Sequence, residues 1–170
     1  MDKVLELDAV SRDFTSGIFR TRTTRAVDRV SFALERGRTF GLVGNSGCGK
    51  TTLSRMITRV LRPTSGTIRF EGEDIAGFDR RQCKAYHRRV QIIFQNPEAS
   101  LDPSIRIRDS LLEAMAIHHL GESKEAHMEK IQATLRQVGL PDYLLSRYPH
   151  QISGGEGQRL VICRALLLEP

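Results

Sequence analysis

Apolar side chains occur at every second position, or in short unbroken runs, in several segments of the first 95 residues. Alternation is typical of a strand with one buried face, and a short apolar run is typical of a strand buried on both faces. We therefore expect an edge strand at residues 4–9, a half-buried strand at 26–34, buried strands at 39–43 and 90–94, and a strand at 67–70. Residues 15–26 are polar and basic and should form a loop or a hairpin.

A helical period follows the first buried run. Leu53, Met56, Ile57 and Val60 fall on one face of a helix over residues 50–61. A proline and a glycine come directly after this segment and should end the helix.

The pattern changes after residue 95, where helical spacing replaces alternation. Just before the change, Asp79 and Gln82 have the spacing of a capping box, which predicts a short helix to about residue 88. Further helices are expected at residues 108–119, 123–138, 143–148 and 153–168. We therefore expect a single domain in two parts, an α/β core over residues 1–95 and an all-helical part over residues 96–170.

The composition is that of a globular protein, with 39% hydrophobic and 27% charged residues among 170. No apolar stretch approaches the ~18 residues that a membrane-spanning helix needs, and the N-terminus does not resemble a signal peptide. We therefore expect a soluble, cytoplasmic chain. Cys48, Cys83 and Cys163 lack the spacing of metal ligands and should be free thiols.

The net charge of +6 reflects an excess of arginine. Such an excess is compatible with a nucleic-acid or anionic membrane surface. Aromatic residues do not alternate with these arginines along the chain, as a surface that stacks on bases would require. A solvated basic surface is the simpler interpretation, and no direct nucleic-acid partner is expected.

A glycine-rich loop with the pattern Gly-x-x-x-x-Gly-Lys-Thr lies between the run at 39–43 and the helix at 50–61. Its glycines allow backbone amides to approach phosphate oxygens, Lys50 supplies a cation, and the Thr51 hydroxyl is a hard ligand for Mg²⁺. The alternative is a glycine-rich turn that binds nothing. The strand, loop and helix context favours a nucleoside triphosphate, with ATP expected. The residues expected to contact it are Gly44, Asn45, Ser46, Gly47, Cys48, Gly49, Lys50, Thr51 and Thr52.

Cys48 lies within this loop, near a helix N-terminus. A thiol at such a position tends to have a lowered pKa and can be sensitive to alkylation. The residue could equally be a small side chain that faces inward.

A second glycine-containing motif precedes the last predicted helix. Ser153 and Glu156 have the spacing of a capping box. That interpretation leaves Gly154 and Gly155 unexplained, because glycine in the first turn of a helix costs about 1 kcal/mol relative to alanine. Two adjacent glycines suit the close approach of an anion to the helix N-terminus.

Taken together, the phosphate loop (Walker A), Phe94-Gln95 after a predicted strand, and Ser-Gly-Gly before a helix resemble the nucleotide-binding domain of an ABC transporter. Residues 90–103 and 26–32 are similar to the ATP-binding subunits of oligopeptide, dipeptide and nickel importers. This resemblance implies an α/β fold with a P-loop NTPase core of the RecA type, N-terminal antiparallel strands and a helical subdomain.

The resemblance also implies roles for individual residues. Lys50 and Gln95 would take part in catalysis, and Thr51 and Gln95 would bind Mg²⁺, with Gln95 coupling the site to the membrane subunits. Ser153, Gly154, Gly155 and Glu156 would lie against the ATP held by an opposite domain. Phe14 is the first candidate to stack on adenine and Phe19 the second, although either could be an ordinary core or loop aromatic.

The implied partners are a second nucleotide-binding domain and transmembrane permease subunits. ATP would be sandwiched between the two domains, and the chain would contact the inner face of the cell membrane only through the permease. The implied activity is ATP hydrolysis coupled to import. The transported solute is not specified by this chain.

The sequence also departs from the family pattern. The signature motif usually reads Leu-Ser-Gly-Gly-Gln, whereas Ile152 and Glu156 stand at its ends here, and Gly157 replaces a frequent basic residue. The Walker B strand, with its acidic residues, would follow Pro170. We therefore expect this chain alone to hydrolyse ATP poorly and to be prone to aggregation.

Two alternatives remain open from the sequence. The chain could be an ATP-binding remnant without turnover, or an ABC-class ATPase that acts on nucleic acid. The basic charge fits the second alternative weakly, and no zinc or coiled-coil insertion interrupts the chain.

Overall fold

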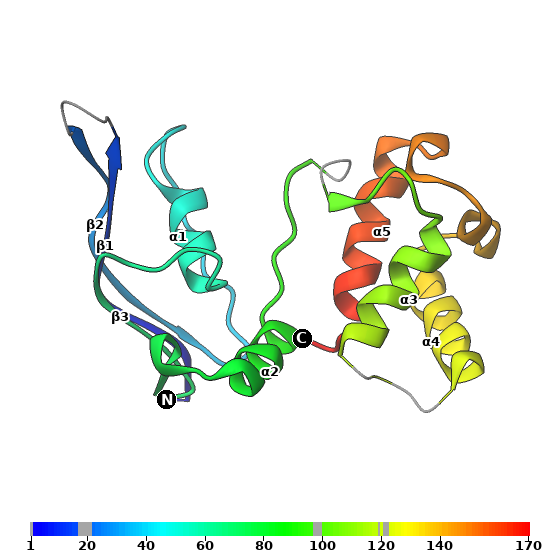
Figure 1. Ribbon diagram of the computed structural model, residues 1–170, viewed down its shortest axis with the longest axis horizontal. Coiled ribbons are helices and arrows are strands. Elements are labelled where there is room, and N and C mark those ends of the chain that lie inside the picture. The colour runs from blue at the N-terminus through cyan, green and yellow to red at the C-terminus, as the bar shows by residue number, and fades with distance from the viewer. Residues whose placement is uncertain (1, 17–21, 97–99, 119, 121–122) are drawn as a thin grey trace. The chain divides into compact units, whose positions relative to one another are not determined.

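A computed structural model describes residues 2–16, 22–96, 100–118, 120 and 123–170 (Figure 1). Contacts divide the chain into two units, Met1–Cys83 and Lys84–Pro170. This boundary lies inside helix α2, Arg80–Arg89, and therefore earlier than the change of pattern at residue 95. The functional division at residue 95 remains a prediction.

The first unit is built on an antiparallel four-stranded sheet in the order β2-β1-β3-β4. Its strands are β1 (Lys3–Ser16), β2 (Arg22–Glu35), β3 (Ser65–Phe70) and β4 (Glu73–Asp74). Leu7 of β1 lies opposite Phe32 of β2 and also opposite Ile68 of β3. The prediction of an edge strand at residues 4–9 was therefore wrong, because the partner β3 is distant in the sequence and leaves no mark on the local pattern.

Residues 15–26 were expected to form a loop or a hairpin, and the antiparallel pairing of β1 with β2 favours the hairpin. The two strands pair to their ends, with Ser16 opposite Arg22, and both are longer than predicted. A stacked pair of Phe32 and Phe40 rings, 4.5 Å between centroids, holds the chain beyond β2 against that strand.

Helix α1, Lys50–Ile57, buries Leu53 and Met56 as predicted, but it is shorter than expected. Arg59 has a left-handed backbone (φ 59°), which an α-helix cannot continue. Val60 is consequently 71% exposed and does not belong to the buried face. A short 3₁₀-helix, η1 (Ile75–Gly77), follows β4 and buries the side chain of Ile75.

The two predicted buried strands at 39–43 and 90–94 are not formed. Both segments lie in the described part of the chain and neither is a strand. Val43 is 94% exposed, and Phe94 is 40% exposed. A strand needs a hydrogen-bonded neighbour, and the sheet of the described residues contains β2, β1, β3 and β4 alone.

The second unit is helical. It contains α3 (Ile107–Ile117), α4 (Lys124–Gln137), α5 (Gly154–Leu166) and the 3₁₀-helices η3 (Asp142–Ser146) and η4 (Pro149–Gln151). Its core joins one face of each α-helix, and the side chains with at most 1% exposure include Ile107, Leu111, Ile131, Leu135 and Leu160. The predicted helices are confirmed, with ends that differ by one or two residues in most cases.

Polar side chains fix the helix ends as the sequence predicted. Asp79 and Gln82 exchange side-chain to backbone hydrogen bonds at the start of α2, at 2.8 and 3.0 Å.

No helix among the described residues is both long and apolar enough to cross a membrane.

Candidate phosphate-binding site

The glycine-rich loop needs glycine at position 49 for the fold itself. Gly49 caps α1 with φ 98°, and a Cβ built there would lie 2.3 Å from the carbonyl oxygen of Ala26 and 3.2 Å from Val27. Such contacts are impossible without movement of β2. Gly47 also has a positive φ, 83°, but a Cβ there would meet no atom within 4 Å. The loop is therefore anchored at Gly49 and open to solvent at Gly47.

Lys50 holds its ammonium group inside the loop. The Nζ atom donates to the carbonyl oxygen of Gly44 at 2.5 Å and to that of Asn45 at 2.7 Å. The Lys50 cation thus lies among the residues that the sequence predicts to surround phosphate. Asn45, Ser46 and Cys48 around it are exposed.

The side chains after Lys50 begin the helix. Thr51 is exposed and Thr52 is half-buried in the first turn of α1. The first-turn amides of a helix have no partner within the helix, and the helix dipole makes this end favourable for anions. Loop, ammonium and helix end together form a concentration of donors suited to phosphate oxygens.

Cys48 contacts the loop rather than a core. Its Sγ atom lies 3.5 Å from Lys50 Nζ, and a Cβ on Gly44 would approach that sulfur to 2.6 Å. Glycine at position 44 therefore leaves room for the Cys48 side chain, which remains exposed.

The second motif forms the capping box that its sequence predicts. The backbone N–H of Ser153 donates to Glu156 Oε2 at 2.8 Å, the Ser153 hydroxyl donates to the same oxygen at 2.7 Å, and the Glu156 N–H donates to Ser153 Oγ at 3.3 Å. These hydrogen bonds from Ser153 hold the pKa of the Glu156 carboxyl below its usual value, and the one from the backbone has the largest effect. The charge of Arg159 lowers this pKa further, by a smaller amount.

Gly154 and Gly155 are exposed, and a Cβ at either position would meet nothing within 4 Å. Packing within the chain therefore does not require glycine here. The two residues leave the N-terminus of α5 bare, as the predicted approach of an anion needs.

Gln95 and Phe14 are exposed. Gln95 lies in the second unit, whereas the glycine-rich loop lies in the first. Phe14 is 41% exposed on β1, with the Arg12 guanidinium 4.8 Å from its ring centre. Phe19 lies outside the described residues. These roles remain predictions.

Mg²⁺ prefers oxygen ligands and often keeps water and phosphate oxygens around it. The Thr51 hydroxyl and the Gln95 amide oxygen are of this kind. Among the described residues, no group of three or more His, Cys, Asp or Glu side chains is placed so that it could hold a metal ion.

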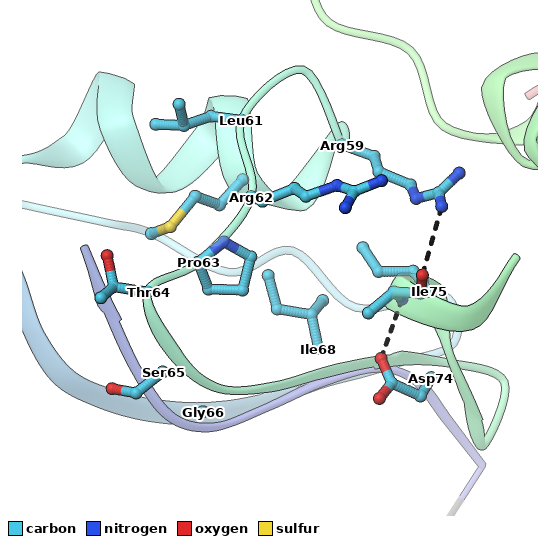
Figure 2. Close-up of a pocket in the computed structure, with 12 residues that line it drawn as sticks. Arg59, Leu61, Arg62, Pro63, Thr64, Ser65, Gly66, Ile68, Asp74 and Ile75 are labelled. Atoms are coloured by element: carbon cyan, nitrogen blue, oxygen red, sulfur yellow. Dashed lines mark hydrogen bonds between the residues drawn. The ribbon is translucent and has the colours of Figure 1, made fainter. Parts of the chain in front are cut away.

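A cavity of about 190 Å³ in the first unit was not anticipated from the sequence (Figure 2). Met56, Ile68 and Ile75 supply its apolar wall. Arg59 donates to the carbonyl oxygens of Ala76 at 3.3 Å and Phe78 at 3.0 Å, and Asp74 accepts from the Ala76 N–H. These polar groups stabilise the turn after β4.

A second cavity, of about 240 Å³, lies in the helical unit. It is lined by Glu113, His118 and Arg164, among others. Arg164 donates to the carbonyl oxygen of Ser100 at 2.8 Å, and burial lowers its pKa. The lining residues are far apart in the sequence, so no local pattern reveals this cavity.

The glycine-rich loop, with Lys50 and the N-terminus of α1 beside it, has the pattern of P-loop nucleotide-binding domains. A family model described as ABC transporter matches residues 27–170. This chain belongs to that family.

Curated relatives include the putative oligopeptide transport ATP-binding protein YkfD of Bacillus subtilis, 42% identical over 98% of this chain and 50% of that protein. The di/tripeptide transport ATP-binding protein DppF of Pseudomonas aeruginosa is also 42% identical, over 100% of this chain and 53% of its own. The chain thus spans about half the length of the curated relatives it matches.

Solved structures share the fold. The post-hydrolysis dimer of the ATP-binding cassette MJ0796 bound to ADP and Pi has a TM-score of 0.84 at 23% identity, over 98% of this chain and 70% of that one. CbiO1 from Clostridium perfringens, part of the ABC transporter complex cbiONQ, has a TM-score of 0.79 at 23% identity, over 100% and 63%.

Proposed function

We propose that this chain is the ATP-binding, energy-coupling part of an ABC importer for peptides, nickel or similar small solutes. The observation that carries the proposal is the Lys50 ammonium held within the glycine-rich loop, 2.5 Å from the carbonyl oxygen of Gly44. The peptide-transport names of relatives that are 42% identical support the importer over an ATPase acting on nucleic acid.

The residues of the loop bind and orient the polyphosphate. Lys50 exchanges its two carbonyl partners for phosphate oxygens, and the first-turn amides of α1 donate to the same group. Thr51 and Gln95 would hold Mg²⁺, which neutralises charge on the phosphates when bound. Phe14 is proposed to stack on adenine.

A second nucleotide-binding domain would complete the site. Ser153, Gly154 and Gly155 would lie against the terminal phosphate of the nucleotide on the opposite domain, so that ATP closes two domains together. Permease subunits would receive that movement and hold the chain at the cytoplasmic face of the membrane.

Hydrolysis needs a group that accepts a proton from the attacking water. The loop and its flanks, residues 39–52, contain no Asp or Glu. We therefore expect the 170-residue chain to turn ATP over slowly or not at all. A steady-state rate abolished by Lys50→Ala would contradict this.

Titration calorimetry with Mg·ATP tests the proposed binding. We expect saturable heat with the unsubstituted chain and its loss with Lys50→Ala. Lys124→Ala, at an exposed lysine in the first turn of α4, removes the same charge and should bind normally. Equal binding by the Lys50 and Lys124 variants would refute the proposal.

A further inference from the structure

Helix α2, Arg80–Arg89, contains basic residues and no carboxylate of its own. From residue 80 to residue 97 the sequence has five lysine and arginine residues and no Asp or Glu. The carboxylate just before the helix, that of Asp79, accepts the Gln82 N–H at 2.8 Å as the cap of the first turn. The positive charge of α2 is therefore not balanced within its own segment.

This charge gathers on one side of the helix, around Lys84. Residues three and four positions apart are neighbours on a helix surface, with about 5–6 Å between their Cβ atoms. At these four positions around Lys84 lie Arg80, Arg81, His87 and Arg88. Lys84 and Arg88 are half-buried, and the other three are exposed. We call these five residues the α2 basic face.

The arrangement opposes the stability of the helix that carries it. Like charges at this spacing repel, and Arg80 and Arg81 also lie at the positive end of the helix dipole. Among the residues that the structure describes, no Asp or Glu lies within ion-pair distance of Arg80, Arg81 or Lys84. Arg88 has such a partner, Glu169, at 3.6 Å.

The arginines around β2 differ from those of α2 in this respect. Arg25 lies 2.8 Å from a carboxylate oxygen of Asp13, and Arg36 lies 2.8 Å from one of Asp2. Carboxylates of the same unit thus balance charge near β2, whereas the α2 basic face keeps most of its charge unpaired. An extended anionic surface is the complement of such a face.

Lipid headgroups fit this face better than nucleic acid. Tyr86 is the one Phe, Tyr or Trp residue of α2, and at 2% exposure its ring cannot stack on a base. Ala85 is the one exposed apolar residue of the helix, so no large side chain is available to insert among acyl chains. The contact would be purely electrostatic, as between a polybasic segment and the anionic lipids of a cytoplasmic leaflet.

We propose that the α2 basic face binds the anionic headgroups of a phospholipid bilayer, as an attachment to the membrane in addition to the permease subunits. The inference rests on the function proposed above only for the presence of a membrane beside the chain. The contact itself involves neither the glycine-rich loop nor nucleotide, and its strength should fall as salt screens the charges.

Vesicle flotation tests this contact, because vesicles rise in a density gradient and aggregated protein does not. The chain should float with vesicles of phosphatidylcholine and phosphatidylserine, and should stay behind with vesicles of phosphatidylcholine alone. Screening shortens from about 10 Å at about 0.1 M salt to about 3 Å at about 1 M, so flotation should be lost at the higher salt.

The informative variant combines Arg80→Gln with Lys84→Gln. We expect it to bind the anionic vesicles about 30-fold more weakly, at roughly fivefold for each charge removed. The matched control combines Lys124→Gln with Arg136→Gln, which removes the same charge from exposed positions of α4 and should bind nearly as well as the unsubstituted chain. Glutamine keeps the helix propensity of lysine and arginine, so urea titration should show that the α2 variant is no less stable.

Three results would overturn the inference. Flotation could be absent at about 0.1 M salt or persist at about 1 M salt, the two ends of the screening range. The two double variants could weaken binding equally, which would show that net charge acts rather than the α2 basic face. Duplex or single-stranded oligonucleotides could bind more tightly than the vesicles and lose affinity in the α2 variant, which would assign the face to nucleic acid.

The same measurements separate this inference from the proposed function. Lys50→Ala should float like the unsubstituted chain, because Lys50 is not part of the α2 basic face. If Mg·ATP binds in a Lys50-dependent way and the vesicles do not bind, the inference is overturned and the proposed function stands. If the vesicles bind through α2 and Mg·ATP does not bind, the proposed function fails and the lipid contact stands.

Discussion

Glycine at position 49 is required by contact as well as by backbone conformation. Its φ of 98° disfavours any side chain by about 1–2 kcal/mol, and the Ala26 carbonyl oxygen occupies the place of a Cβ. We expect Gly49→Ala to lower the free energy of unfolding by about 3 kcal/mol, since the clash adds to the conformational cost. Urea titration measures the change.

Gly47→Ala is the control for that experiment. It meets the same conformational cost at φ 83° but no neighbouring atom. It should destabilise the chain by about 1–2 kcal/mol. Equal losses for both variants would show that the contact with Ala26 has no energetic weight.

Cys48 and Cys163 should differ sharply in reactivity. Cys163 is fully buried, and burial raises its pKa to about 12. Thiolate is the reactive form, so at pH 8 Cys163 should stay unmodified in the native chain, whereas exposed Cys48 reacts. Iodoacetamide labelling with peptide mass analysis, native and in urea, checks this. Labelling of Cys163 as fast as of Cys48 in the native chain would contradict the burial.

At the scale of elements, the capping box before α2 offers a clean test. Asp79 accepts the Gln82 N–H at 2.8 Å and is exposed. Asp79→Ala should cost about 1 kcal/mol of unfolding free energy, by loss of the cap. Asp79→Asn retains an acceptor and should cost much less, as urea titration of both would show.

Caps and helices were the elements that the sequence predicted best, because their signals are local. The boxes at Asp79 and Ser153, and the helix predicted at 123–138, formed as expected. The strand predictions at 39–43 and 90–94 failed, because an apolar run indicates only a tendency to be buried. Whether it becomes a strand depends on a partner elsewhere in the chain. The same non-local dependence placed β1 inside the sheet.

The candidate site divides in the same way. Glycine, lysine and threonine spacing located the loop, yet could not show that Lys50 contacts the carbonyl oxygens of Gly44 and Asn45. The capping spacing of Ser153 and Glu156 was visible, whereas the donation of the serine proton to the carboxylate required coordinates.

At the scale of the whole molecule, the two units should respond separately to damage in their cores. Leu135 of α4 is fully buried in the helical unit. Leu135→Ala should cost about 2–5 kcal/mol, through lost burial and the cavity left behind. Hydrogen exchange should show faster exchange in α3, α4 and α5, with little change in β1 to β3.

Leu166→Ala is the matched control, because this leucine on α5 is 41% exposed. Its effect on exchange should be small. A uniform loss of protection across both units after Leu135→Ala would show instead that the chain opens as one cooperative body.

The position of the Lys50 ammonium has a thermodynamic consequence. Its charge already rests on two peptide oxygens, so in the proposed binding mode nucleotide entry would replace these two partners, and the two oxygens would then need water as a new donor. The enthalpy of nucleotide binding should therefore be less favourable than for a lysine that has no partner before phosphate binds. The Lys50 side chain should also lose little conformational entropy on binding, because it is already held in the loop. In this binding mode, the affinity for nucleotide depends on the free energy needed to break the hydrogen bonds from Lys50 to the carbonyl oxygens of Gly44 and Asn45.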